Sequence, residues 1–168
     1  MTPKSLLRHR LCVSPLADFG PGTTFHRVMY DNEKLCADQD VKRVVLCSGK
    51  VYYDLLERRR KEQLGHVALI RLEQLYPFPE DQIKTIIKKY SNAGQWIWVQ
   101  EEPENMGAWQ FVKPRLEKLA DTAVSYIGRA AASSPATGFP TIYKEEQSGI
   151  VNEAVGHTPG HGKSAEVG

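Results

Sequence analysis

The sequence predicts an α/β fold, a three-layer sandwich around a mostly parallel sheet. Three observations support this prediction. Strand-like and helix-like segments alternate four times from Val41 onward, the rhythm of a parallel sheet with helical connections. The strand-like segments are continuous apolar runs, as expected of strands that are buried on both faces. The helix-like segments have apolar residues at intervals of three and four, so each has one face that can pack on the sheet.

The predicted strands are four apolar runs, at residues 43–47, 67–70, 96–99 and 124–127. The turn Ser48-Gly49-Lys50 directly follows the first run. Ser48 is the predicted N-cap of the next helix, because a serine hydroxyl can accept a hydrogen bond from the free N–H groups of a first turn. The apolar face of that helix is formed by Val51, Leu55, Leu56 and Leu64.

Three further helices are predicted. The second has an acidic first turn and a basic last turn, as the helix dipole favours. Its apolar stripe consists of Ile83, Ile86, Ile87 and Tyr90. The stripe of the third consists of Trp109, Val112, Leu116 and Leu119. Pro114 lies within the third helix and predicts a kink or a late start. A loop is predicted over 130–140, and a fourth helix over 143–155 that ends at Gly156.

The periodic part of the chain has irregular flanks. Residues 1–40 contain several prolines and the run Gly20-Pro21-Gly22 without a clear element, which predicts an irregular interdomain strap packed against another domain. Residues 41–156 form the predicted α/β domain. Residues 157–168 are polar and rich in glycine, which predicts a disordered tail.

Composition and charge narrow the function classes. The 168 residues have a formal net charge of +2, which gives no reason to expect nucleic acid as a partner. No apolar stretch is long enough to cross a bilayer, so no membrane partner is expected. Three cysteines at spacings that match no zinc or redox motif predict reduced thiols and an intracellular protein.

Two stretches could support chemistry on their own. Ser48-Gly49-Lys50 lies at a strand-to-helix turn, where anions bind in such folds, but the glycine spacing of a P-loop is absent. Helix capping is the favoured interpretation, and a free-standing phosphate-binding protein or small enzyme is the alternative. Glu101 and Glu102 follow a strand, but neighbouring residues of a strand point to opposite faces and need not converge. No catalytic residue and no metal ligand is therefore assigned.

Five longer motifs resemble one family, the C-terminal domain of the thiamine-dependent first component of 2-oxoglutarate dehydrogenase. Together they cover nearly the whole chain up to Gly156. They are TPKSLLRH at 2–9, VKRVVLCSGKVYYDLLERRR at 41–60, RLEQLYPFPED at 71–81, WVQEEPENMGAW at 98–109 and YIGRAAASSPATG at 126–138.

The resemblance implies a fold similar to the transketolase C-terminal domain. It implies that the full-length enzyme uses thiamine diphosphate and magnesium to decarboxylate 2-oxoglutarate oxidatively, and succinylates the lipoyl group of the second component in the tricarboxylic acid cycle. The implied partners are the preceding domains of the same enzyme, a homodimer partner and the lipoyl-bearing second component. The implied location is the bacterial cytoplasm or the mitochondrial matrix.

The resemblance also implies that this segment is non-catalytic. In the family the cofactor is held by preceding domains through a GDG motif, and no GDG occurs in this sequence. No cofactor is therefore expected in this segment, whose implied roles are dimerisation, domain packing and allosteric binding of AMP or acetyl-CoA. Thr2, Lys4 and Arg8 are the candidate effector residues, because cations and hydroxyls suit phosphate. Met106 and Trp109 are interpreted either as interface anchors or, for Trp109, as packing on the sheet.

Overall fold

The computed structural model describes residues 3–33 and 36–156. The candidate effector residue Thr2 and the predicted tail at 157–168 lie outside these described residues. None of the helices in this part of the chain is long and apolar enough to cross a membrane.

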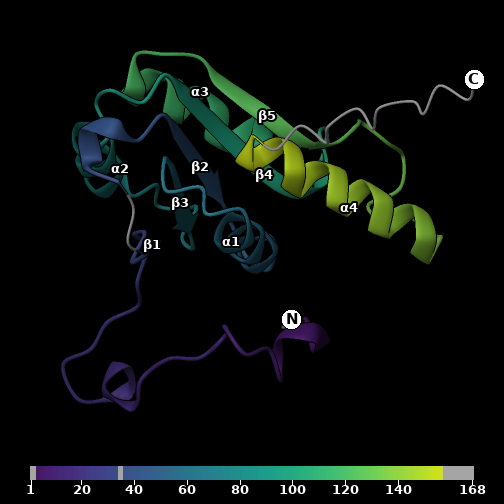
Figure 1. Ribbon diagram of the computed structural model, residues 1–168, viewed down its shortest axis with the longest axis horizontal. Coiled ribbons are helices and arrows are strands. Elements are labelled where there is room, and N and C mark those ends of the chain that lie inside the picture. The colour runs from purple at the N-terminus through teal and green to yellow at the C-terminus, as the bar shows by residue number, and fades with distance from the viewer. Residues whose placement is uncertain (1–2, 34–35, 157–168) are drawn as a thin grey trace, which may run out of the picture.

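A five-stranded sheet forms the middle layer, with strand order β1-β3-β2-β4-β5 (Figure 1). β2 (Arg43–Cys47), β3 (Val67–Leu72), β4 (Gln95–Pro103) and β5 (Val124–Arg129) are parallel to one another, and β1 (Val28–Met29) pairs antiparallel with β3. The mostly parallel α/β fold is therefore confirmed. The sequence gave no indication of β1, because two residues are too few for a recognisable apolar run.

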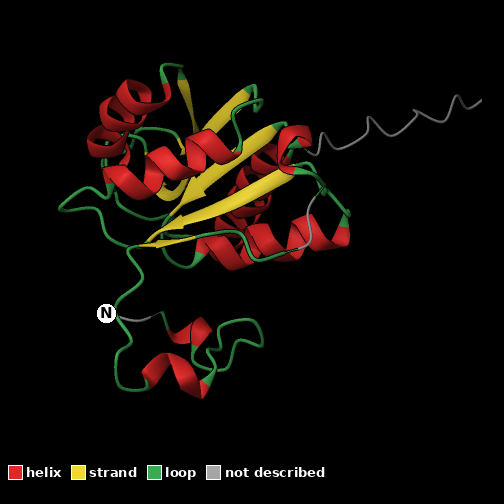
Figure 2. Cartoon of the chain, turned by 90° about the vertical axis from the view of Figure 1, so that its left-hand side faces the viewer, coloured by secondary structure: helices red, strands yellow, loops and turns green. Residues whose placement is uncertain are grey.

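Helices cover both faces of the sheet, which completes the three layers (Figures 1 and 2). They are α1 (Val51–Lys61), α2 (Glu80–Lys89), α3 (Trp109–Ala120) and α4 (Pro140–Val155). Val44 and Leu46 of β2 pack in the same apolar cluster as α2 and α3. Val45 and Cys47 pack in the same cluster as α1 and α4. The strands read as continuous apolar runs because successive side chains enter different cores.

Three local predictions need correction. Ser48 is not the N-cap of α1, because Gly49 turns the chain at φ +72° and Lys50 is the residue that precedes the helix. α3 begins at Trp109 and continues through Pro114, so the predicted late start is wrong. α4 begins at Pro140 rather than at residue 143, since proline suits the first helical position, where its missing N–H is not needed. Gly156 ends α4 at φ +80°, as predicted.

Residues 3–27, called the N-terminal arm below, extend away from the three layers (Figures 1 and 2). They contain two short 3-10 helices, Lys4–Leu6 and Leu16–Phe19. The chain returns to the domain at β1, and the buried carboxylate of Asp31 then forms an ion pair with Arg59 of α1. Residues close behind the arm are therefore integral to the α/β core.

Candidate functional site

The candidate site lies at the carboxyl edge of the sheet, between β2 and β4. From β2 the chain continues to β3 on one side, and from β4 to β5 on the other, so the strand order reverses at this point. Crevices of this kind are where ligands bind in open α/β sheets. The crevice holds a pocket of about 580 Å³ lined by Ser48, Gly49 and Lys50 from one side and by the loop after β4 from the other.

Lys50 is engaged by neighbouring side chains. Its Nζ lies 2.5 Å from Oε1 of Glu101 and donates a 3.3 Å hydrogen bond to the Tyr143 hydroxyl. Tyr143 in turn donates to the same Glu101 oxygen at 2.9 Å. Burial lowers the pKa of Lys50, but the hydrogen bond and charge of Glu101 outweigh it, and the pKa is raised. A phosphate at the Ser48-Gly49-Lys50 turn would therefore have to displace a carboxylate that already neutralises the lysine.

Gln100 organises the loop after β4. Its Oε1 accepts hydrogen bonds from the Trp98 indole at 2.9 Å and from the backbone N–H of Trp109 at 3.1 Å. Its Nε2 donates to the carbonyls of Met106 at 2.7 Å and Pro103 at 3.1 Å. Sequence reasoning missed Gln100, although its place directly before the acidic run is a usable signal. Trp109 is buried against Tyr126, so it packs on the sheet.

Arg129 joins the ends of β4 and β5 to α4. Its guanidinium donates to the Glu101 carbonyl, to Glu146 at 2.8 Å and to Gln147 at 3.3 Å. Hydrogen bonds from Thr137 and Arg129 lower the pKa of the Glu146 carboxyl. Arg129 was also missed, because its partners are distant in the sequence. These contacts hold the carboxyl edge rigid rather than leaving groups poised for reaction.

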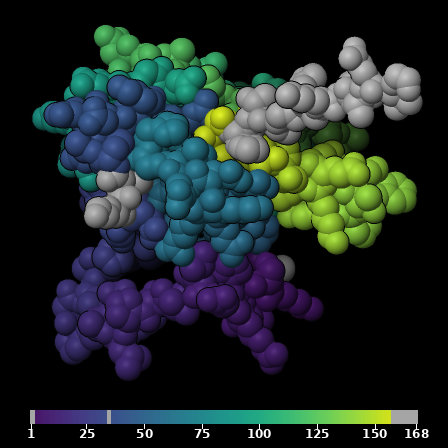
Figure 3. Space-filling view, in the orientation of Figure 1, coloured from purple at the N-terminus to yellow at the C-terminus, as the bar shows by residue number. Residues whose placement is uncertain are grey.

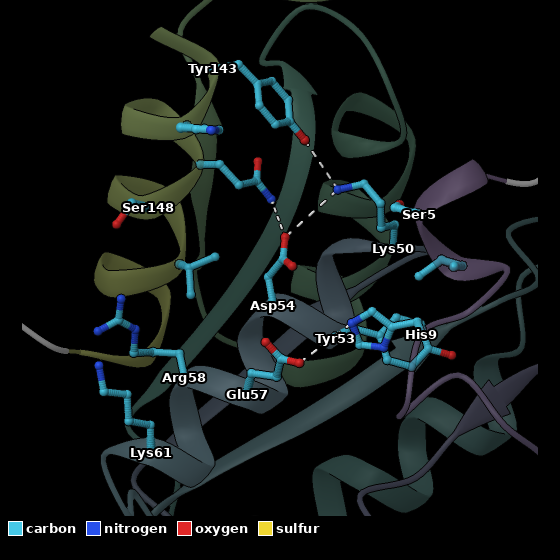
Figure 4. A pocket seen from close by; sticks show the side chains of 14 residues that line it. Ser5, His9, Lys50, Tyr53, Asp54, Glu57, Arg58, Lys61, Tyr143 and Ser148 are labelled. Atoms are coloured by element: carbon cyan, nitrogen blue, oxygen red, sulfur yellow. Dashed lines mark hydrogen bonds and ion pairs between the residues drawn. The ribbon is translucent and has the colours of Figure 1, made fainter. Parts of the chain in front are cut away.

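A second pocket, also of about 580 Å³, lies between α1 and α4 and is closed by the N-terminal arm (Figure 4). Three cations line it on the helices, namely Arg58, Lys61 and Lys144. Two carboxylates also line it, those of Asp54 and Glu57. Asp54 accepts a 2.8 Å hydrogen bond from Gln147, and Glu57 lies 3.6 Å from His9. Since both carboxylates have partners, the cations make this pocket suited to an anion.

The predicted effector residues lie at the rim of this second pocket rather than in its wall. Lys4 and Arg8 are exposed, and neither lines the pocket. Their neighbours Ser5, Leu6 and His9 do line it. The His9 ring stacks on Tyr53 with 5.1 Å between centroids, which fixes the arm on α1.

The described residues do not provide a site for a metal-bound diphosphate. Within residues 3–33 and 36–156, no three His, Cys, Asp or Glu side chains come together as a ligand set. Cys47 is not available as a nucleophile, because burial raises the pKa of its thiol to about 12. The chemistry that this edge can support on its own is binding, through polar groups whose charges are already paired.

Comparisons with known proteins give a consistent result. The family model described as 2-oxoglutarate dehydrogenase C-terminal matches residues 13–155. Relatives named 2-oxoglutarate dehydrogenase E1 component share 46% identity in Coxiella burnetii, 47% in Cupriavidus necator and 43% in Brucella ovis. The alignments cover 92%, 92% and 93% of this chain. The chain spans only 17%, 16% and 17% of the length of these relatives.

Proposed function

The chain belongs to the 2-oxoglutarate dehydrogenase C-terminal family, and on that premise we propose that it serves as a non-catalytic domain of the first component of a 2-oxoglutarate dehydrogenase complex. One observation supports this most strongly. More than nine-tenths of the chain aligns with relatives of that name, while the alignment covers about one-sixth of their length. The chain therefore corresponds to one segment of a much larger protein.

The activity proposed for the whole protein is oxidative decarboxylation of 2-oxoglutarate, with transfer of the succinyl group to the lipoyl group of the second component. Thiamine diphosphate and magnesium would supply the decarboxylation chemistry from domains other than this one. The proposed partners are the preceding domains, a second copy of the enzyme and the lipoyl-bearing component. The proposed location is an intracellular compartment, the bacterial cytoplasm or the mitochondrial matrix.

The polar groups of the carboxyl edge support a non-catalytic role for this segment. Lys50, Glu101 and Tyr143 bond one another, and Arg129 is held by Glu101 and Glu146. A general base must be able to reach a proton of the substrate, and these groups already have short internal partners. The described residues also lack a ligand set for the magnesium that would hold a diphosphate.

Calorimetric titration of the purified 168-residue chain tests this proposal. We expect no saturable heat with thiamine diphosphate and magnesium, and no decarboxylation of 2-oxoglutarate above the buffer rate. Stoichiometric binding of thiamine diphosphate, or turnover that scales with the concentration of the chain, would refute the non-catalytic role.

We further propose that the pocket between α1 and α4 binds an anionic effector, AMP or acetyl-CoA, with Lys4 and Arg8 reaching its phosphates from the arm. The cations of the pocket wall and the exposed, unstructured reach of these two long side chains support the proposal. Charge-assisted hydrogen bonds of this kind contribute about 1.5–3 kcal/mol each, so Arg8→Ala should weaken binding roughly tenfold or more.

Titration with AMP and with acetyl-CoA measures this effect. Arg10→Ala is the matched control, because Arg10 is an exposed arginine of the same segment that does not line the pocket. Arg58→Ala removes a cation from the wall itself. If wild type binds neither compound, or if Arg8→Ala and Arg10→Ala bind equally, the assignment to Arg8 is wrong.

A further inference from the structure

The exposed large apolar side chains of the described residues are confined to one side of the molecule. Among residues 3–33 and 36–156, eight such side chains are exposed. They are Leu7, Val13, Leu16, Phe19, Phe25, Tyr76, Phe139 and Ile142. Five belong to the N-terminal arm, and the other three follow the carboxyl ends of strands. An asymmetric distribution of this kind is typical of a surface that contacts a partner.

The three residues outside the arm lie at the carboxyl edge. Tyr76 lies in the loop after β3 and lines the crevice pocket with Leu75 and Phe111. Phe139 and Ile142 lie at the start of α4. The other end of α4 is at the amino edge, since Arg43 at the start of β2 donates to the carbonyls of Glu153 and Ala154. The start of α4 therefore faces the same edge as Tyr76.

Both ends of the arm attach at this edge. Pro3 lines the crevice pocket beside Ser48 and Gly49. At the other end, Val28 pairs with Leu72, the last residue of β3. Between these attachments the arm projects away from the α/β layers (Figures 1 and 3). The carboxyl edge and the arm thus form one side of the molecule.

The middle of the arm has no support from the domain. Its backbone hydrogen bonds are local, such as Asp18 N–H to the Pro15 carbonyl and Gly20 N–H to the Ala17 carbonyl. Leu16 is 89% exposed and Phe19 is 76% exposed. Large apolar side chains held in water oppose folding, so an arm of this composition is stabilised only when another surface covers it.

We propose that this side of the molecule, called the docking face, packs against the polypeptide that precedes this segment in the longer relatives. The inference rests on the proposed function. Five-sixths of the Coxiella burnetii relative lies outside the aligned segment. Pro3 lies in the crevice pocket, so a chain that leads into this segment arrives at the docking face itself. An occupant is therefore covalently delivered to the only such face that the described residues present.

The test replaces the aligned segment of the Coxiella burnetii relative with this chain. Chymotrypsin cleaves after aromatic residues in open segments, so the isolated chain should be cut rapidly at Phe19 and Phe25. In the chimera, cleavage at these two sites should be at least tenfold slower. Equal cleavage rates in a chimera that decarboxylates 2-oxoglutarate would overturn the docking face while leaving the proposed function intact.

A pair of substitutions gives an independent readout. Leu16→Ser with Phe19→Ser should leave the melting temperature of the isolated chain unchanged, because both side chains are exposed there. The same pair in the chimera should restore fast cleavage at Phe25. Thr122→Ala, an exposed substitution in the loop between α3 and β5, is the control and should change neither protein.

Sedimentation of the isolated chain distinguishes the other occupant and does not depend on the chimera. We expect a monomer at micromolar concentration. A dimer that dissociates in the Leu16→Ser, Phe19→Ser variant would assign the docking face to a second copy of this chain and overturn the proposal.

Discussion

Removal of Asp31 should destabilise the domain more than the loss of a single ordinary hydrogen bond. The side chain of Asp31 is completely buried and that of Arg59 is 4% exposed. The carboxylate accepts from both terminal nitrogens of Arg59, from the N–H of Leu69 at 2.6 Å and from the N–H of Glu33 at 3.0 Å. Asp31 thereby joins the segment after β1 to α1 and β3.

Asp31→Ala leaves the guanidinium of Arg59 buried, with the Val67 carbonyl as its remaining hydrogen-bond partner in the domain. Leaving one charge of a buried pair uncompensated costs about 3–5 kcal/mol. At roughly 2–4 °C per kcal/mol for a domain of this size, the melting temperature should fall by roughly 6–20 °C. Urea unfolding followed by tryptophan fluorescence measures the change in free energy, provided that the m-value is unchanged.

A double-mutant cycle separates the pair from the rest of the core. Replacing both partners with apolar residues, as in Asp31→Leu with Arg59→Met, removes the uncompensated charge and should recover most of the lost stability. A loss below about 1 kcal/mol for Asp31→Ala, or strictly additive effects in the cycle, would refute the reasoning.

Three further predictions concern the carboxyl edge. Gly107→Ala should destabilise the domain by about 1–3 kcal/mol in urea unfolding, because the backbone has φ +67° and a Cβ would lie 2.9 Å from Gln100 Nε2; Gly94→Ala, with nothing within 4 Å, should have little effect. In the folded chain at pH 8, a thiol reagent should label exposed Cys36 and spare Cys47, whose pKa is raised to about 12 by burial; equal labelling rates would contradict this. The lowered pKa of Glu146 stabilises the fold above the ordinary carboxyl pKa, and this contribution is lost as pH falls through the folded value; Glu146→Gln should therefore reduce the loss of stability on acidification, and an unchanged acid limb would contradict the assignment.

The layered fold could be predicted from the sequence because burial on both faces requires continuous apolar strands. Val44-Val45-Leu46-Cys47 shows this directly, since its residues alternate between two cores. β1 could not be predicted in the same way, because its pairing with β3 depends on the register Val28 to Leu72 rather than on a local pattern. The N-cap assignment of Ser48 failed because the left-handed Gly49 shifts the start of the helix.

The candidate site was less predictable than the fold. Lys50 and Glu101 were recognised as chemically suggestive, but their pairing joins residues that are distant in sequence, and only the sheet brings them together. Gln100 and Arg129 bond mainly to backbone carbonyls, which give no sequence pattern. The arm motif led to Lys4 and Arg8, whereas the helical phase of the arm turns Ser5 and His9 into the pocket.

Decarboxylation of 2-oxoglutarate, measured side by side for the chimera and for the isolated chain, tests the central claim most directly. A chain that is a non-catalytic C-terminal domain should replace the aligned segment of the Coxiella burnetii relative with activity retained, and should show none alone. Turnover by the isolated 168-residue chain would contradict the account, as would a folded chimera that binds thiamine diphosphate but has lost decarboxylation.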